Sequence, residues 1–386
     1  MGHTLHVVPA STLDYRRLAE RRLPRFLFDY IDGGANDEIT LTRNVADFQR
    51  LRLRQRVLVD VSNIDTATTL AAEPAAMPLA LAPLGMAGMM ARRGEVQAVR
   101  AADAAGVPFT LSTAGVCPLA EVRAAARRDF WFQLYMVRDR GAVRALLERA
   151  RATGCGTLIF TVDLAALGMR HRDTRNGMTS NSLKAQLARA WQIGTRPSWL
   201  YDVALRGRPH GLGMLAEVVP EAARLNAVRN WLHTQFDASV TWKDIEWLRG
   251  IWPGKLILKG LQEVDDVRAA LAVGADGVIV SNHGGRQLDG VASSISKLPA
   301  VVDAVGDRLE VFVDGGVRSG LDVFKAVALG ARGVLIGRPW IWAVAGAGEA
   351  GLVSLLASFR RELEIAMALA GVSRVSQIGR ELIDTD

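Results

Sequence analysis

The stretch 255–337 contains four short apolar runs, KLILK (255–259), GVIVS (277–281), EVFVD (310–314) and GVLIG (333–337), separated by segments with helical patterning. Such runs, bounded by turn residues, indicate buried parallel strands joined by crossover helices. Four similar runs lie earlier in the chain: PLALAP (78–83), PFTLST (108–113), FWFQLY (130–135) and TLIFTVD (157–163). Eight strand–helix units in succession predict an α/β fold, a closed (β/α)8 TIM barrel.

The spacing of these runs also predicts what lies outside the barrel. Neighbouring runs start 22 to 33 residues apart, except for the interval from 157 to 255. We therefore expect a long insertion after the fourth strand, at 171–240. Residues 1–77 precede the first strand, and the helical composition of 15–30 predicts an N-terminal helical segment that caps the barrel. Residues 1–386 are expected to form a single domain. The arginines expected on exposed helix faces are Arg16, Arg17, Arg21 and Arg22.

The composition is that of an ordinary globular chain. Of 386 residues, 49% are apolar and 23% charged, which excludes a disordered, collagenous or coiled-coil protein. Two cysteines exclude a disulfide framework and a four-thiolate metal site, and they fit a reducing compartment. We expect no export signal, and the prolines within the longest uncharged run, 74–91, argue against a membrane-spanning helix there.

The insertion is basic and carries interleaved aromatic residues. It has nine Lys or Arg against five Asp or Glu, a large part of the formal net charge of +7. Such a composition is typical of a segment that lies on an anionic membrane surface, and equally of a solvated loop with its aromatics packed on the barrel. No nucleic-acid binding motif accompanies it, so we expect no nucleic-acid partner. The aromatic residues are Trp191, Trp199, Tyr201 and Trp231.

Polar residues gather where the predicted strands end. In this fold the C-terminal ends of the strands form the active site. Any one of these residues could be a strand-end cap, but so many at one mouth predict a binding site. They are Ser112, Gln133, Tyr135, Thr161, Asp163, Lys259, Ser281, Asn282, His283, Asp314 and Arg338.

The last two strands lead into glycine-rich turns, DGGVRSG (314–320) and IGR (336–338). Glycines expose backbone N–H groups and arginine adds a bidentate donor, which is how the loops after strands seven and eight of a barrel hold phosphate. We therefore expect a ligand that carries a phosphate. The alternative is that these segments are two ordinary glycine turns that bind no ligand.

The segment NHGGR (282–286) places His283 at a strand end, two glycines after it, and Arg286 next. This is a potential base beside a carboxylate clamp. Asp163, at another strand end, could hold the imidazole tautomer and stabilise its cation. A lone strand-end histidine is more often structural, but its companions favour catalysis.

Two other site types are not expected. The remaining histidines lack the spacing of metal ligands, so we assign no metal. The letters GAGEAG (346–351) match the dinucleotide fingerprint, but they follow the eighth strand, and no acidic residue lies at the required distance beyond them. We therefore expect no nicotinamide site.

At this point the chain resembles the FMN-dependent α-hydroxy-acid oxidising family, in particular its bacterial respiratory L-lactate dehydrogenases. The resemblance covers about 15–378, and the matching stretches include LPRFLFDYIDGGAN (23–36), APLGMAGMMARRGEV (82–96) and SNHGGRQLD (281–289). It implies a role for each position at the barrel mouth: His283 would be the general base and Asp163 its partner. Substrate would bind to Tyr30, Tyr135, Arg170 and Arg286. FMN would bind to Pro83, Leu84, Gly85, Ser112, Gln133, Thr161, Lys259, Ser281, Asp314, Gly315, Gly316, Arg318, Gly337 and Arg338.

For activity, the resemblance implies oxidation of an L-2-hydroxy acid, such as L-lactate to pyruvate, with electrons passed to a membrane quinone or another respiratory-chain acceptor. Gly85 stands where oxidases of the family commonly have alanine, which favours a dehydrogenase. A homotetramer is implied, attached peripherally to the cytoplasmic side of the inner membrane through the insertion.

Three alternatives stay open. A dehydrogenase for L-mandelate or another longer 2-hydroxy acid would share the design, since small residues near Gly85 could admit a larger substrate. A barrel that isomerises a sugar or prenyl phosphate would explain the glycine turns but not the clustered arginines. The third alternative is a membrane-bound scaffold that retains FMN but catalyses no reaction.

Overall fold

The computed structural model describes residues 8–216 and 237–384. Each of the eight predicted runs coincides with a strand whose residues are almost all buried. The strands are β4 (Leu79–Leu81), β5 (Thr110–Ser112), β6 (Trp131–Leu134), β7 (Thr157–Thr161), β8 (Lys255–Leu261), β9 (Gly277–Val280), β10 (Glu310–Asp314) and β11 (Gly333–Ile336).

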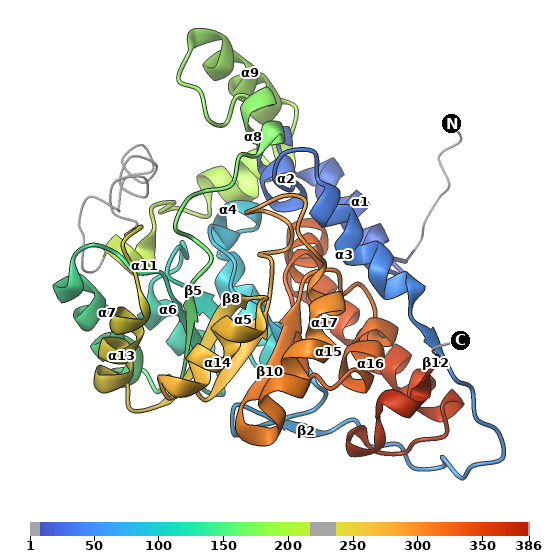
Figure 1. The fold of residues 1–386 in the computed structure, drawn as a ribbon. Helices are drawn as coiled ribbons and strands as arrows, with labels where there is room; N and C mark the ends of the chain where they lie inside the picture. The colour runs from blue at the N-terminus through green and yellow to red at the C-terminus, as the bar shows by residue number, and fades with distance from the viewer. Residues whose placement is uncertain (1–7, 217–236, 385–386) are drawn as a thin grey trace.

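These strands form one parallel sheet in the order β4–β11–β10–β9–β8–β7–β6–β5. Leu81 of β4 and Phe109, beside β5, form a further parallel bridge, so the sheet closes on itself. The predicted (β/α)8 barrel is confirmed (Figure 1). The barrel interior is filled by side chains that include Trp131, Ile257 and Phe312. It is therefore a packed core rather than a pore, as expected for this fold.

Helices surround the sheet, as Figure 1 shows. They follow the strands because each crossover needs an amphipathic helix to cover the outer face of the sheet. They are α4 (Ala87–Met90), α5 (Gly94–Ala105), α6 (Leu119–Ala125), α7 (Arg140–Ala152), α13 (Trp242–Ile251), α14 (Val264–Ala272), α15 (Ser294–Val305), η3 (Gly306–Arg308), α16 (Gly320–Ala328) and α17 (Arg338–Leu369).

The N-terminal segment contains α1 (Thr12–Arg22), α2 (Arg25–Asp32) and α3 (Ile39–Arg50). The helical stretch expected over 15–30 is thus two helices, because Pro24 cannot continue α1 and instead caps α2. Arg17 and Arg21 are exposed as expected, whereas Arg16 and Arg22 are half-buried and ion-paired, Arg16 with Asp32 at 2.6 Å and Arg22 with Asp202 at 2.7 Å.

Short strands and turns close the opposite end of the barrel. The hairpin of β2 (Thr68–Leu70) and β3 (Glu73–Ala75) adds Leu70 and Ala75 to the side chains that fill the interior. The segment after α3 is joined to the end of the described chain by β1 (Arg52–Leu53) and β12 (Ile383–Asp384), which pair antiparallel. Two short helices, η4 (Val375–Gln377) and η5 (Arg380–Leu382), connect α17 to β12.

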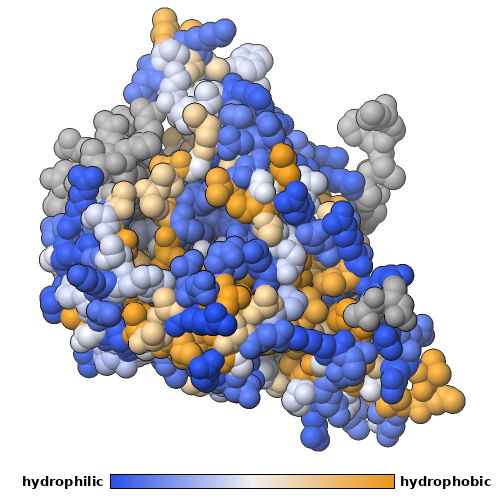
Figure 2. All heavy atoms as spheres, in the orientation of Figure 1, coloured by the Kyte–Doolittle hydropathy of each residue, from blue (hydrophilic) through white to orange (hydrophobic). Residues whose placement is uncertain are grey.

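The insertion leaves β7 and returns to β8 through α13. It contains α8 (His171–Arg175), α9 (Leu183–Gly194), α10 (Pro197–Trp199), η1 (Leu200–Leu205), a π-helix, and α11 (Gly213–Ala216). Its residues 217–236, with Trp231, lie outside the described residues. The segment around α9 projects beyond the barrel (Figure 1), and apolar side chains are among its outermost atoms (Figure 2).

Helix α17 is long and apolar enough to cross a membrane by length and composition, but half of its most apolar window is buried inside the protein. It packs along α1 and α5 and is interrupted at Gly348, whose φ is 70°. A Cβ on Gly346 would lie 2.8 Å from the Cβ of Leu18. The GAGEAG stretch therefore serves close packing of helices, which explains its glycines without a nucleotide.

Candidate active site

A cavity of about 1320 Å³ lies at the C-terminal ends of the barrel strands. Its walls also include α2 and the start of the insertion. Most of the predicted site residues line it: Tyr30, Pro83, Leu84, Gly85, Tyr135, Thr161, Arg170, Lys259, His283, Arg286, Asp314, Gly315, Gly316, Arg318, Gly337 and Arg338. Four predicted residues are not in the lining: Ser112, Gln133, Asp163 and Ser281.

His283 and Asp163 form a pair although they follow different strands, β9 and β7. The Nδ1 atom of His283 lies 2.9 Å from Oδ1 of Asp163. The backbone N–H of His283 donates to Ser281 Oγ at 3.0 Å, which holds the residue in a left-handed conformation with φ 56°. A Cβ on Gly260 would lie 2.7 Å from the Asp163 side chain, so only glycine in β8 leaves room for this carboxylate.

Burial and ion pairing act in opposite directions on this pair. Burial lowers the pKa of His283 from its usual value, and the attraction of Asp163 only partly offsets it. Burial acts to raise the pKa of Asp163, but His283 and Lys259 outweigh it and the pKa is lowered. The pair therefore favours neutral His283 beside ionised Asp163. With Asp163 accepting from Nδ1–H, Nε2 faces the cavity as a proton acceptor.

Two guanidinium groups flank the ring of Tyr30 at the cavity wall. Arg286 Cζ lies 5.0 Å and Arg170 Cζ 5.9 Å from the ring centroid. Arg286 Nη1 donates to the carbonyls of Tyr30 at 2.5 Å and Gly33 at 3.0 Å, which orients the group. Burial and the neighbouring Arg170 lower the pKa of Arg286 to about 10. Two cations held together at an apolar wall favour an organic anion.

Asp173 is a site residue that the sequence did not reveal. It is buried, lines the cavity, and lies 3.9 Å from Arg170. Burial raises its pKa above the usual range. Asp173 lies on α8, and it reaches the cavity only because the insertion folds back over the mouth of the barrel. The nearest signal in the sequence is the single acidic residue that follows the basic run in RHRD (170–173).

The turns after β10 and β11 form a cradle at one end of the cavity. Gly315 and Gly316 have φ of 85° and 98°, conformations that L side chains rarely adopt. Arg318 lies over the ring of Trp342 at 5.2 Å, and burial lowers its pKa to about 10. Gly337 lines the same cavity. Backbone N–H groups and a desolvated guanidinium are the donors that phosphate binding requires.

Arg338 reaches the cavity but is largely engaged with the backbone. Its guanidinium donates to the carbonyls of Asp32 at 3.1 Å, Gly33 at 2.8 Å and Gly284 at 2.9 Å. It thereby fastens the turn after α2 to the loop that carries His283. The sequence could not predict this, because the three carbonyls come together only in the folded chain.

Lys259 occupies the floor of the cavity. Its Nζ lies 3.0 Å from Asp314 Oδ2 and donates to Ser281 Oγ at 3.0 Å. Burial acts to lower its pKa, but Asp314 and Asp163 reverse this and raise it. An ammonium group that stays charged in a buried site can stabilise negative charge on a ligand above it.

A chain of side-chain hydrogen bonds runs across the ends of β5, β6 and β7. Ser112 Oγ donates to Gln133 Oε1 at 2.9 Å, and Gln133 Nε2 donates to Thr161 Oγ1 at 3.0 Å. In the described part of the chain, Oδ1 of buried Asp314 has no hydrogen-bond partner. A cradle for phosphate at one end and a polar, charged floor beside it fit a flavin mononucleotide.

The fold and the site define a barrel enzyme with a base, an anion clamp and a place for a phosphorylated cofactor. A family model described as FMN-dependent dehydrogenase matches residues 19–385. The chain belongs to the FMN-dependent dehydrogenase family, and FMN is its cofactor.

Known proteins of this kind are similar over the full length. An L-lactate dehydrogenase of Caulobacter vibrioides (strain NA1000 / CB15N) is 53% identical over 98% of both chains. An L-lactate dehydrogenase of Alcaligenes faecalis is 50% identical over 98% of this chain and 99% of its own. The solved structure of the monotopic membrane protein (S)-mandelate dehydrogenase has a TM-score of 0.91 and 34% identity, with 98% of this chain and 100% of that chain covered. A mandelate oxidase structure has a TM-score of 0.83 and 36% identity, with coverage of 98% and 99%.

Proposed function

We propose that this protein oxidises L-lactate to pyruvate with FMN as the immediate electron acceptor. The observation that supports it most is the convergence of His283, Arg170 and Arg286 on one cavity. A 2-hydroxy acid presents a carboxylate and, next to it, a CH–OH group whose oxidation to a ketone removes two electrons and two protons, one from the carbon and one from the hydroxyl. The arginine pair suits the carboxylate, and the histidine can accept a proton from the CH–OH group. The similar L-lactate dehydrogenases agree with this substrate.

In this mechanism Arg170 and Arg286 bind the substrate carboxylate and fix its orientation. Fixing the substrate converts an encounter into an effectively unimolecular reaction. His283 Nε2 accepts the proton, and Asp163 stabilises the imidazolium that results. Burial raises the pKa of Tyr135, so its hydroxyl stays protonated and can donate to a substrate oxygen. Bound FMN supplies a two-electron acceptor.

We also propose which residues hold FMN. The cradle of Gly315, Gly316, Arg318 and Gly337 would hold the phosphate. Lys259 would lie where negative charge develops on the reduced ring. The other positions would line the ring or support the groups that do: Pro83, Leu84, Gly85, Ser112, Gln133, Thr161, Ser281, Asp314 and Arg338.

We also propose a quinone or other respiratory-chain acceptor and a peripheral position on the cytoplasmic side of the inner membrane. Leu183, Leu187 and Trp191 on α9 are exposed by 72%, 62% and 75%, as in a segment that enters the interfacial region of a bilayer. Trp199 is buried instead, and its Nε1–H donates to the carbonyl of Met89. A homotetramer is proposed from the resemblance alone, and light scattering of the purified protein would test it.

L-mandelate is a second candidate substrate. The solved structures named above are a mandelate dehydrogenase and a mandelate oxidase. Gly85 has no side chain and its neighbour Ala114 only a methyl group, so the wall of the cavity presents little bulk here, close to the Tyr30 hydroxyl.

Steady-state turnover with an artificial dye acceptor separates these candidates. We expect the value of kcat/KM for L-lactate to exceed that for L-mandelate and for longer 2-hydroxy acids. Fast mandelate beside slow lactate would reject the lactate assignment. Flavin that none of these acids reduces would instead support a scaffold without turnover.

A further inference from the structure

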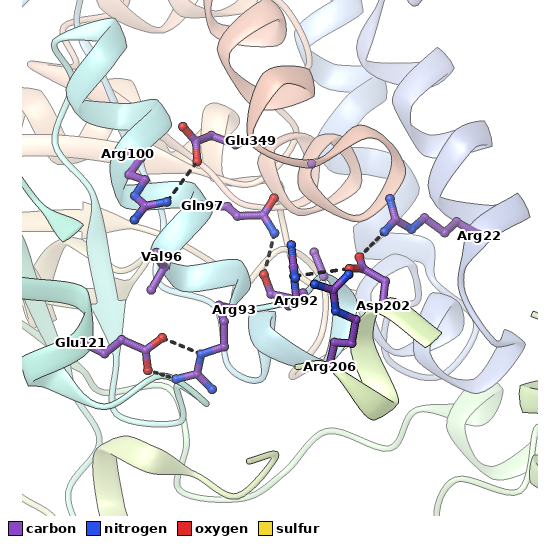
Figure 3. Close-up of a pocket in the computed structure, with 12 residues that line it drawn as sticks. Arg22, Arg92, Arg93, Val96, Gln97, Arg100, Glu121, Asp202, Arg206 and Glu349 are labelled. Carbon is purple, nitrogen blue, oxygen red and sulfur yellow. Dashed lines mark hydrogen bonds and ion pairs between the residues drawn. The ribbon is translucent and has the colours of Figure 1, made fainter. Parts of the chain in front are cut away.

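A second cavity, of about 600 Å³, lies away from the active site (Figure 3). It is bounded by the end of α1, the start of α5, the π-helix η1 and the break in α17 at Gly348. It shares no lining residue with the larger cavity. Five of its lining side chains are arginines, which we call the arginine pocket: Arg22, Arg92, Arg93, Arg100 and Arg206.

The carboxylates of the arginine pocket are all engaged and fewer than the arginines. Asp202 is shared by Arg22 at 2.7 Å and Arg92 at 3.3 Å. Glu121 pairs with Arg93, and Glu349 lies 3.9 Å from Arg100. The lining therefore carries a net positive charge, which an anion would neutralise.

Two guanidinium groups retain donors that an anion could use. In the described part of the chain, no carboxylate pairs with Arg206, whose Cζ lies 5.6 Å from the Tyr201 ring centroid. There too, the buried Nε of Arg22 has no hydrogen-bond partner. Figure 3 shows Arg22, Arg92 and Arg206 converging on Asp202. Several planar guanidinium groups around one space favour the oxygens of a phosphate, which accept bidentate hydrogen bonds.

Apolar side chains beside the arginine pocket indicate that this phosphate belongs to a membrane lipid. Tyr201 and Leu205 lie on η1, the same helix as Asp202, and are exposed by 61% and 53%. Helix α10 joins η1 to α9, which carries the exposed apolar residues described above. Aromatic and apolar side chains adjoining arginines are typical of proteins at the membrane interface, where the chains enter the bilayer and the cations meet headgroups.

We propose that the arginine pocket binds the phosphate of an anionic phospholipid at the junction of the insertion and the barrel. Most of its arginines come from α1 and the α4–α5 region rather than from the insertion. A bound headgroup would therefore tie the insertion, through Arg206, to the body of the enzyme, in addition to the ion pairs that Asp202 makes with Arg22 and Arg92. This inference rests on the proposed membrane attachment.

A monomeric short-chain lipid tests the pocket without the surface potential of a bilayer. The purified holoenzyme is titrated calorimetrically with dihexanoylphosphatidylglycerol below its micelle concentration, and separately with inorganic phosphate and dihexanoylphosphatidylcholine. We expect phosphatidylglycerol to bind and Arg206→Gln and Arg92→Gln each to weaken it about tenfold. The matched control is Arg208→Gln, which removes a charge from the same segment outside the pocket and should change affinity less than about twofold.

Several results would overturn the inference: no binding of phosphatidylglycerol, equal losses in Arg206→Gln and Arg208→Gln, or equal binding of phosphatidylcholine. Inorganic phosphate that binds as tightly as the lipid would show a soluble anion to be the ligand and would also overturn it. Flotation of the wild type with phosphatidylglycerol vesicles tests attachment separately. If the wild type floats while the pocket variants bind the short-chain lipid normally, attachment stands and the pocket inference fails. If the wild type does not float, the proposed attachment fails.

Discussion

At the residue scale, the surroundings of His283 suit it to the proposed role of a base. Burial keeps the ring uncharged, Asp163 fixes its tautomer, and Ser281 holds its backbone in a strained conformation. Asp163 and Ser281, like His283 itself, follow strand ends, so the barrel places the three residues together. The proposed base is therefore neutral and oriented before substrate binds.

The pH dependence of kcat/KM follows from this arrangement. Only neutral His283 can accept a proton, so activity should rise with pH through the pKa of this residue and then level off. Because that pKa is lowered from the usual 6.5, the midpoint of the rise should lie below about pH 6.5. Kinetics with L-lactate and a dye acceptor over a pH series would check this. A plateau reached only above about pH 8 would contradict a desolvated imidazole.

Lys259→Met should weaken FMN binding and stability together. The change leaves Asp314 buried without its cation, which destabilises a protein by about 3–5 kcal/mol. Flavin absorbance retained after gel filtration and the free energy of unfolding in urea would measure both effects. Lys297→Met, at a partly exposed pair with Glu263, is the control and should change neither appreciably. Normal flavin content and stability in Lys259→Met would remove the proposed role.

Gly85→Ala should raise KM for L-lactate. The added Cβ would lie 3.0 Å from the Cβ of Ala114 and face the Tyr30 hydroxyl, so the neighbouring wall must shift. We expect a several-fold loss in kcat/KM, about 1 kcal/mol, with FMN content preserved. An unchanged KM would show that substrate does not approach this wall.

The residues that could be predicted are those whose role depends on being at a strand end. His283, Lys259 and Asp314 could be found because a barrel brings all strand ends to one mouth. Asp173 and the backbone contacts of Arg338 could not, because they depend on how the insertion and the turn after α2 lie across that mouth.

At the element scale, burial decides what the sequence reveals. The eight strands are enclosed on both faces and so appear as continuous apolar runs. The break between α1 and α2 follows from Pro24, which was visible in the sequence. The break in α17 at Gly348 was not visible, because a glycine within an apolar helix is often tolerated. The helices of the insertion were also hidden, since α9 packs only part of its surface and keeps several apolar side chains exposed.

Helix α9 should control membrane attachment independently of chemistry. Changing Leu183, Leu187 and Trp191 together to Ser should lower binding to vesicles at least about a hundredfold, because each apolar side chain loses its transfer free energy. Dye-linked lactate oxidation should persist. The control changes Val57, Leu58 and Val59 to Ser, three exposed apolar residues outside the insertion. Equal loss in both variants, or none in the first, would contradict a membrane role for α9.

At the scale of the whole molecule, one face of the barrel carries the chemistry and the other closes the core. The β2–β3 hairpin fills the far end, while the strand ends, α2 and the insertion build the cavity. The same end carries α9, so the proposed membrane contact lies on the side from which substrate and acceptor reach the flavin (Figure 1). The central claim is that groups far apart in the chain act together over one bound FMN.

Anaerobic stopped-flow mixing of the holoenzyme with L-lactate tests that claim most directly. We expect rapid bleaching of the flavin in the wild type and in His210→Ala, whose histidine lies outside the cavity. We expect His283→Ala to retain FMN but to be reduced about a thousandfold more slowly, because the base is lost while the phosphate cradle remains. Reduction of His283→Ala at the wild-type rate would contradict the account.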